Sequence, residues 1–174
     1  RDRLPAAKGV PAEMRCLLAG GDAALDAVKG CLDGVAAMSA DEEADLRNAE
    51  ILQAWDDAAF LAPVPDPTII LSIGMNYQEH LDEMEGTPAP PRPTGFTMTH
   101  PALTGHRKPI VVPPQCPDMI DYEGEMTFVF GKSCHNVSEA HAMDYVAGYT
   151  IANDVSARDW VGPIFTVTKP FEMV

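Results

Sequence analysis

Glu123 and Glu125 form a pattern whose residue types could do chemistry. They stand one residue apart in a run rich in aromatic and β-branched residues that ends at Gly131. Such a run predicts a β-strand with alternating side chains, so both carboxylates share one face, roughly 6.6–6.8 Å apart. A hard divalent cation bound by oxygens is the usual partner of paired carboxylates. A solvated strand face is the alternative, because Glu-x-Glu is frequent by chance.

Asp154 is a candidate third ligand for such an ion. It follows a second strand-like run over residues 146–152, and the end of a strand can present a carboxylate at a sheet edge. The opposite face of the first strand is predicted to be a core face. It carries Tyr122, Met126, Phe128 and Phe130.

His80 and Glu83 form a second candidate pair. Residues three apart share one face of a helical turn, so the carboxylate can lie beside the imidazole and orient it. This arrangement is typical of a general base. The alternative is a solvent-exposed pair at the same spacing, which is common on helices.

Three segments that contain these candidates together resemble the fumarylacetoacetate hydrolase family. They are Asn76 to Glu83, Asp121 to Glu125 and Gly148 to Asp159, and they occur in the family's order with similar spacing. The resemblance covers roughly residues 60–159, and after Asp159 we expect the sequence to depart from the family. We therefore expect the chain to be truncated on its C-terminal side, with Phe165, Val167 and Phe171 as a possible substitute strand.

The resemblance implies roles for the candidate residues. Glu123, Glu125 and Asp154 would hold a divalent metal, with Mg²⁺ expected and Mn²⁺ or Ca²⁺ as alternatives, while His80 and Glu83 would form the catalytic pair. The implied enzyme is a metal-dependent hydrolase or lyase that cleaves a C–C bond in an acylpyruvate-type 2-oxo acid through a metal-stabilised enolate. His80 would activate the attacking water.

Other activities are consistent with the same resemblance. An isomerase, decarboxylase or tautomerase acting on a related 2-oxo or 2-hydroxy dienoic acid would share the enolate. An incomplete, non-catalytic chain is a further alternative. Members of the family are commonly dimers, so a homodimer is expected from the resemblance.

Composition excludes some other classes of function. The 174 residues include 12 Lys and Arg against 26 Asp and Glu, a net charge of −14, so bulk charge disfavours binding to nucleic acid or anionic membrane. No apolar run approaches the ~20 residues of a membrane span. The four cysteines lack C-x-x-C spacing and are expected to be buried or incidental thiols in a reducing compartment, so we predict a cytoplasmic protein.

The predicted fold class is α+β. A small helical region, residues 1–62, precedes part of a β-rich fumarylacetoacetate-hydrolase-like domain of mixed strands, residues 63–174. Three prolines between residues 63 and 67 mark the boundary, because they block a helix.

Local signals predict the elements within these regions. In the leading region, one helix begins with Asp22 as N-cap and ends near Gly34, and Ser39 with Glu42 fits the capping box of a second helix. In the later region we expect a buried strand over 68–73. Further strand candidates and a Ser138-capped helix lie at 96–103, 110–112 and 138–145.

Overall fold

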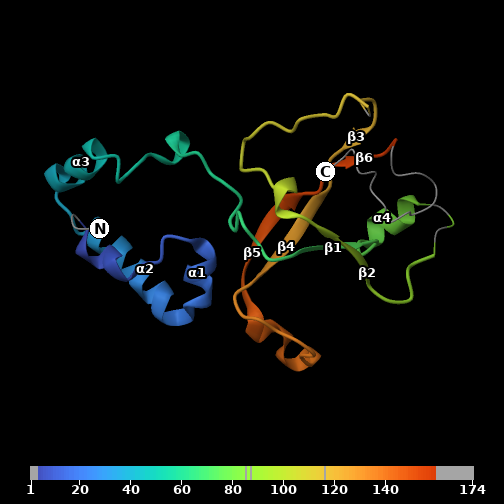
Figure 1. Cartoon of the computed structure of the whole chain (residues 1–174), viewed down its shortest axis with the longest axis horizontal. Helices are drawn as coiled ribbons and strands as arrows, with labels where there is room; N and C mark the ends of the chain where they lie inside the picture. Colours follow the sequence, from blue (N-terminus) through green and yellow to red (C-terminus); the bar gives the residue numbers. More distant parts are fainter. Residues whose placement is uncertain (1–3, 85, 87, 116, 160–174) are drawn as a thin grey trace. The chain divides into compact units, whose positions relative to one another are not determined.

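The computed structural model describes residues 4–84, 86, 88–115 and 117–159, and it has the predicted α+β composition. Helices lead the chain and antiparallel strand pairs follow (Figure 1). The chain divides into two compact units. The first contains Arg1–Val64 with Tyr122–Asp154, and the second contains Pro65–Asp121 with Val155–Val174.

The leading part of the first unit is helical, as predicted. Its α-helices are α1 (Met14–Ala19), α2 (Gly21–Ala36) and α3 (Ala40–Asn48). Two 3₁₀ turns, η1 (Pro5–Gly9) and η2 (Trp55–Asp57), flank them.

Helix α3 has the predicted capping box. The Glu42 backbone N–H donates to Ser39 Oγ at 3.4 Å, and the Ser39 backbone N–H donates to Glu42 Oε2 at 2.9 Å. These two bonds satisfy donors that have no partner within the helix. Hydrogen bonds from the Ser39 backbone and hydroxyl lower the pKa of Glu42 below its ordinary value of 4.5.

Both predicted bounds of helix α2 are wrong. The N-cap is Gly20, and Asp22 lies inside the first turn. Its negative charge still interacts favourably with the positive end of the helix dipole. The helix continues past Gly34 to Ala36, because a glycine inside a helix costs only about 1 kcal/mol and does not by itself end it.

The first unit also contains the paired strands β4 (Gly124–Phe130) and β5 (Val146–Asn153). They are antiparallel, with a register shift between Val129 and Phe130. Both strands lie where the sequence predicts them. The segment between them includes η4 (Glu139–Tyr145), a 3₁₀ helix in which the Ser138 side chain makes no capping hydrogen bond, contrary to the prediction.

Side chains alternate along β4 as expected, but the predicted core face is the more exposed one. Tyr122, which precedes the strand, has a relative exposure of 81%, and Met126 has 59%. Phe128 is 46% exposed and packs edge-on against Tyr149, with ring centroids 5.2 Å apart. Alternation therefore identifies the two faces, but it does not reveal which face other segments cover.

The second unit is built from short elements. They are β1 (Ile70–Gly74), α4 (Gln78–Glu83), β2 (Thr94–Met98), η3 (His100–Ala102), β3 (Ile120–Asp121) and β6 (Ser156–Ala157). Strand β1 pairs with β2 and β3 pairs with β6, both antiparallel.

Several strand predictions for this unit need correction. Strand β1 was expected to be buried, yet Leu71 is 59% exposed. The strand expected over 96–103 ends at Met98, because Pro101 lies in the first turn of η3, where its fixed φ suits a 3₁₀ turn. Residues 110–112 form no strand: prolines flank them at 109 and 113, and proline cannot donate to a strand ladder.

The expectation of buried or incidental thiols left two alternatives, and the cysteines of the described part do not fit the buried one. Cys16 and Cys134 are exposed and Cys31 is half-buried, and all three are free. Cys116 lies outside the described residues. No helix within the described ranges is long and apolar enough to cross a membrane.

Candidate functional site

The site is built around Glu123 and Asp154, which the backbone places opposite each other. The N–H of Asp154 donates to the carbonyl of Glu123 at 2.9 Å. Within the same unit the β4–β5 ladder begins with Gly124 opposite Asn153. Glu123 directly precedes this end of the ladder on one strand, and Asp154 directly follows it on the other.

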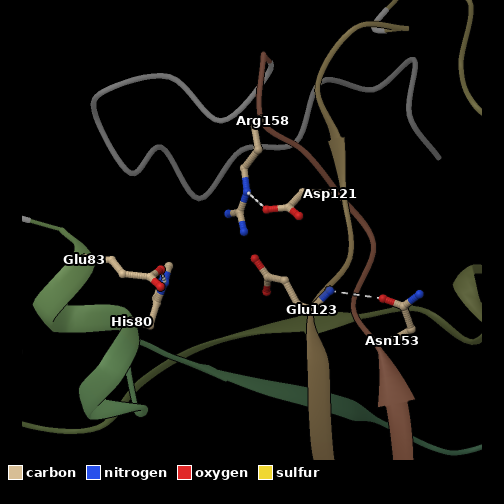
Figure 2. Close-up of polar contacts among 6 residues, drawn as sticks. All are labelled: His80, Glu83, Asp121, Glu123, Asn153 and Arg158. Carbon is tan, nitrogen blue, oxygen red and sulfur yellow. Dashed lines mark hydrogen bonds and ion pairs between the residues drawn. The ribbon is translucent and has the colours of Figure 1, made fainter.

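Asn153 makes the second contact at this position. Its side-chain Oδ1 accepts a hydrogen bond from the N–H of Glu123 at 3.1 Å (Figure 2). The two consecutive residues Asn153 and Asp154 thus bond both backbone polar groups of Glu123. Sequence reasoning missed this role for Asn153. Its position directly before Asp154, at the end of a predicted strand, is the signal that could have found it.

Glu125 lies in β4 opposite Ala152 and on the same side of the strand as Glu123. Glu123, Glu125 and Asp154 are all half-buried. Carboxylate oxygens are the ligands that Mg²⁺, Mn²⁺ and Ca²⁺ take in proteins, so the donor set and its placement along the backbone fit such an ion. The side chains themselves do not converge: the described residues contain no group of three His, Cys, Asp or Glu side chains that could hold a metal.

His80 and Glu83 lie on one face of α4, as their spacing predicts. His80 Nδ1 and Glu83 Oε2 are 4.0 Å apart, with side-chain exposures of 42% and 80% (Figure 2). This distance permits an attraction between opposite charges but is too long for a hydrogen bond. The hydrogen bond that would orient the imidazole is therefore not formed in this structure.

An ion pair that the sequence did not predict joins β3 to Arg158, the residue directly after β6. Arg158 Nε donates to Asp121 Oδ2 at 3.0 Å, and both side chains are half-exposed (Figure 2). The Arg158 N–H also donates to the carbonyl of Met119 at 2.8 Å, which extends the pairing beyond β3. Arg158 is thus held through both its side chain and its backbone.

A cavity of about 310 Å³ lies between the end of β1 and the proline-rich loop of the same unit. Its walls include Met75 and Asn76 on one side and Pro90 and Arg92 on the other. Met75 has φ 58°, which non-glycine residues adopt only when the surrounding structure imposes it. The segment between β1 and α4 is therefore constrained just before the N-cap of α4.

Comparison with protein families gives a match over more than half of the chain. The model of the family described as "Fumarylacetoacetate (FAA) hydrolase C-terminal" matches residues 69–170. The match begins at β1 and continues beyond Asp159, where we expected the resemblance to end. The expectation that the sequence departs from the family directly after Asp159 is therefore wrong, although residues 160–174 lie outside the described part.

Several of the similar proteins carry names of enzymes. An oxaloacetate tautomerase of Xenopus laevis, named as mitochondrial, is 38% identical over 151 residues, which cover 87% of this chain and 42% of that protein. A 5-carboxymethyl-2-hydroxymuconate delta-isomerase structure from Mycobacterium smegmatis is 38% identical with a TM-score of 0.53, covering 63% of this chain and 42% of that one. A fumarylacetoacetate hydrolase from Exiguobacterium antarcticum is 30% identical with a TM-score of 0.50, covering 68% and 45%. The chain thus spans less than half the length of each.

Proposed function

Because the chain belongs to the fumarylacetoacetate hydrolase family, whose members it resembles include a tautomerase and an isomerase, we propose that it acts on a 2-oxo acid by proton transfer through an enolate. The single observation that carries the proposal is the opposed placement of Glu123 and Asp154, fixed by the backbone bond between them. With Glu125 on the same side of β4, three carboxylates line one short stretch of paired chain.

We propose that Glu123, Glu125 and Asp154 hold a divalent metal, most simply Mg²⁺, with Mn²⁺ and Ca²⁺ as alternatives. A bound divalent ion would polarise the carbonyl oxygen of a 2-oxo acid and stabilise the negative charge of an enolate. The carboxylates must turn toward one another to close around an ion.

His80 is the proposed proton carrier. In tautomerisation its imidazole takes a proton from the carbon beside the keto group, and the imidazolium then gives a proton to the enolate oxygen, so the imidazole is regenerated and no bond between heavy atoms breaks. Glu83 stabilises the imidazolium that forms, because the two groups already lie on one face of α4, 4.0 Å apart. A small rotation of either exposed side chain would close the hydrogen bond. Such bonds are often long before substrate binds.

Hydrolytic cleavage of an acylpyruvate is the second candidate function. The likeness to a fumarylacetoacetate hydrolase structure at 30% identity favours it. In this reaction His80 would take a proton from water as the oxygen attacks the distal carbonyl. The C–C bond then breaks, and its electron pair forms the enolate of the 2-oxo acid. The two candidates share the enolate and differ in the bond that breaks.

One assay separates the candidates. The enol form of oxaloacetate absorbs ultraviolet light, so stopped-flow absorbance measures its conversion to the keto form with the chain and Mg²⁺ present. We expect faster conversion than in buffer, and loss of the acceleration on adding EDTA. Cleavage of acetylpyruvate without faster tautomerisation would favour the hydrolase. If the protein binds metal but has neither activity, both candidate functions are contradicted.

Further properties of the protein are proposals as well. We propose a small 2-oxo acid as the substrate, with no nucleic acid or membrane partner. We also propose homodimeric assembly, as the family resemblance implies, in the cytoplasm. Light scattering after gel filtration would test the dimer, with a mass near twice the 18.7 kDa of the chain as the expected result.

A further inference from the structure

Asn153 occupies an unusual position in the pairing of the two strands. In an antiparallel ladder, directly opposed residues exchange two backbone hydrogen bonds at alternate positions. At the opposed residues Glu123 and Asp154, the first bond runs from the Asp154 N–H to the Glu123 carbonyl. The Glu123 N–H instead donates to the side-chain Oδ1 of Asn153 at 3.1 Å. A side-chain oxygen thus accepts the hydrogen bond that a backbone carbonyl accepts in a regular ladder.

These two hydrogen bonds restrain the backbone of Glu123. The peptide N–H before its Cα and the carbonyl after it are both bonded, at 3.1 and 2.9 Å, to the consecutive residues Asn153 and Asp154. Both distances lie within the normal range of hydrogen bonds. The φ and ψ angles of Glu123, which set the direction of its side chain, are therefore tied to the backbone that carries Asp154.

The residue type at this position also matters electrostatically. An amide oxygen accepts the hydrogen bond without adding charge beside the carboxylates of Glu123, Glu125 and Asp154. The substitution Asn153→Asp would keep an acceptor for the same bond but add a like charge, and an apolar residue would leave the Glu123 N–H without this acceptor. Asparagine is thus the residue type that positions the backbone and adds no repulsion.

We propose that Asn153 is a positioning residue that holds Glu123 and Asp154 in the relative placement required to bind a divalent metal. This inference rests on the proposed function, because it assumes that those carboxylates are ligands. Residues that orient metal ligands typically change metal affinity by about 10- to 100-fold when they are replaced. A purely structural role would instead lower the stability of the fold and leave the affinity of the folded protein unchanged.

The test measures Mn²⁺ affinity by the loss of the free-ion electron paramagnetic resonance signal, with thermal unfolding of each variant recorded in parallel. We expect Asn153→Ala to weaken Mn²⁺ binding about 10- to 100-fold. Asn153→Asp, which keeps the acceptor but adds a like charge, should lose less Mn²⁺ affinity than Asn153→Ala. Asn48→Ala, the same change at an exposed position in α3, is the matched control and should leave affinity unchanged.

A second readout follows the hydrogen bond itself. Exchange of the Glu123 amide hydrogen, measured by NMR, should become faster in Asn153→Ala than in the wild type. If that variant does not fold, Asn153→Gln replaces it, because the extra methylene moves the acceptor away from the Glu123 N–H and should also weaken Mn²⁺ binding.

Two results would overturn the inference, and they are distinguishable. Wild-type affinity in folded Asn153→Ala, beside clear Mn²⁺ binding by the wild type, contradicts the positioning role alone. Absence of Mn²⁺ binding by the wild type itself contradicts the ligand assignment, and the positioning role falls with it.

Discussion

His80 shows how far residue types alone define a site. The spacing to Glu83 predicted one shared helical face, and α4 confirms it. The distance of 4.0 Å and the 80% exposure of the Glu83 side chain could not be predicted, because side-chain rotamers on an exposed helix are not fixed by spacing. The hydrogen bond from the Glu123 N–H to the Asn153 side chain could not be predicted either, because it joins residues thirty positions apart.

The roles of His80 and of the carboxylates can be separated by substitution. We expect His80→Ala to reduce tautomerisation about 10²- to 10⁴-fold, the usual loss for a general base, while Mn²⁺ affinity stays unchanged. Stopped-flow absorbance with oxaloacetate and a Mn²⁺ titration measure the two quantities. His100→Ala, at an exposed position in η3, is the control. A variant that loses metal but keeps its rate per bound ion would show that the roles are assigned wrongly.

Elements were predictable where their signals are local. The capping box of Ser39 and Glu42 lies within four residues and is present as predicted. Alternation likewise predicted β4 and β5. The register shift between Val129 and Phe130 depends on a partner strand, and no local signal reveals it. The predicted end of α2 was wrong because a single glycine is a weak signal for the end of a helix.

The cap of α3 should contribute to stability in a pH-dependent manner. At neutral pH we expect Ser39→Ala to lower the free energy of unfolding by about 1 kcal/mol, as N-cap substitutions usually do. The pKa of Glu42 is lowered in the folded state first by the Ser39 backbone N–H, which alanine keeps, and second by the Ser39 hydroxyl. The share that the hydroxyl contributes is present above pH 4.5 and is lost as pH falls through the folded-state pKa. The difference between variant and wild type should therefore shrink in strong acid.

Urea unfolding followed by circular dichroism, at about pH 7 and about pH 3, measures this difference, and both conditions avoid the isoelectric point near 4.5. Ala40→Gly, which changes helix propensity next to the cap without touching its hydrogen bonds, is the control. A Ser39→Ala cost that is equal at both pH values would contradict the ionised capping box.

At the scale of the whole molecule, the location of the core was the hardest feature to predict. The described part buries few apolar side chains fully, and Leu46, 3% exposed, is the largest of them. The aromatic face of β4 is exposed, although its composition suggested a core. Binary pattern defines which residues share a face, whereas burial depends on segments that pack from elsewhere in the chain.

This difference in burial gives a stability prediction. Leu46→Ala should lower the free energy of unfolding by about 2–5 kcal/mol, the range for buried leucines. Phe128→Ala should cost only about 1 kcal/mol, mainly the ring contact with Tyr149. Urea unfolding of both variants provides the comparison. An equal or larger loss for Phe128→Ala would mean that the aromatic face of β4 is covered in solution.

The central claim is that Glu123, Glu125 and Asp154 together bind a divalent metal. Its most direct test is a calorimetric titration of Mn²⁺ into the wild type, Glu125→Gln and the control Glu139→Gln, a matched change at an exposed position in η4. We predict binding by the wild type and the control. Glu125→Gln should bind at least about 10- to 100-fold more weakly, the loss that even supporting residues cause. Equal affinity in all three proteins would contradict the metal site.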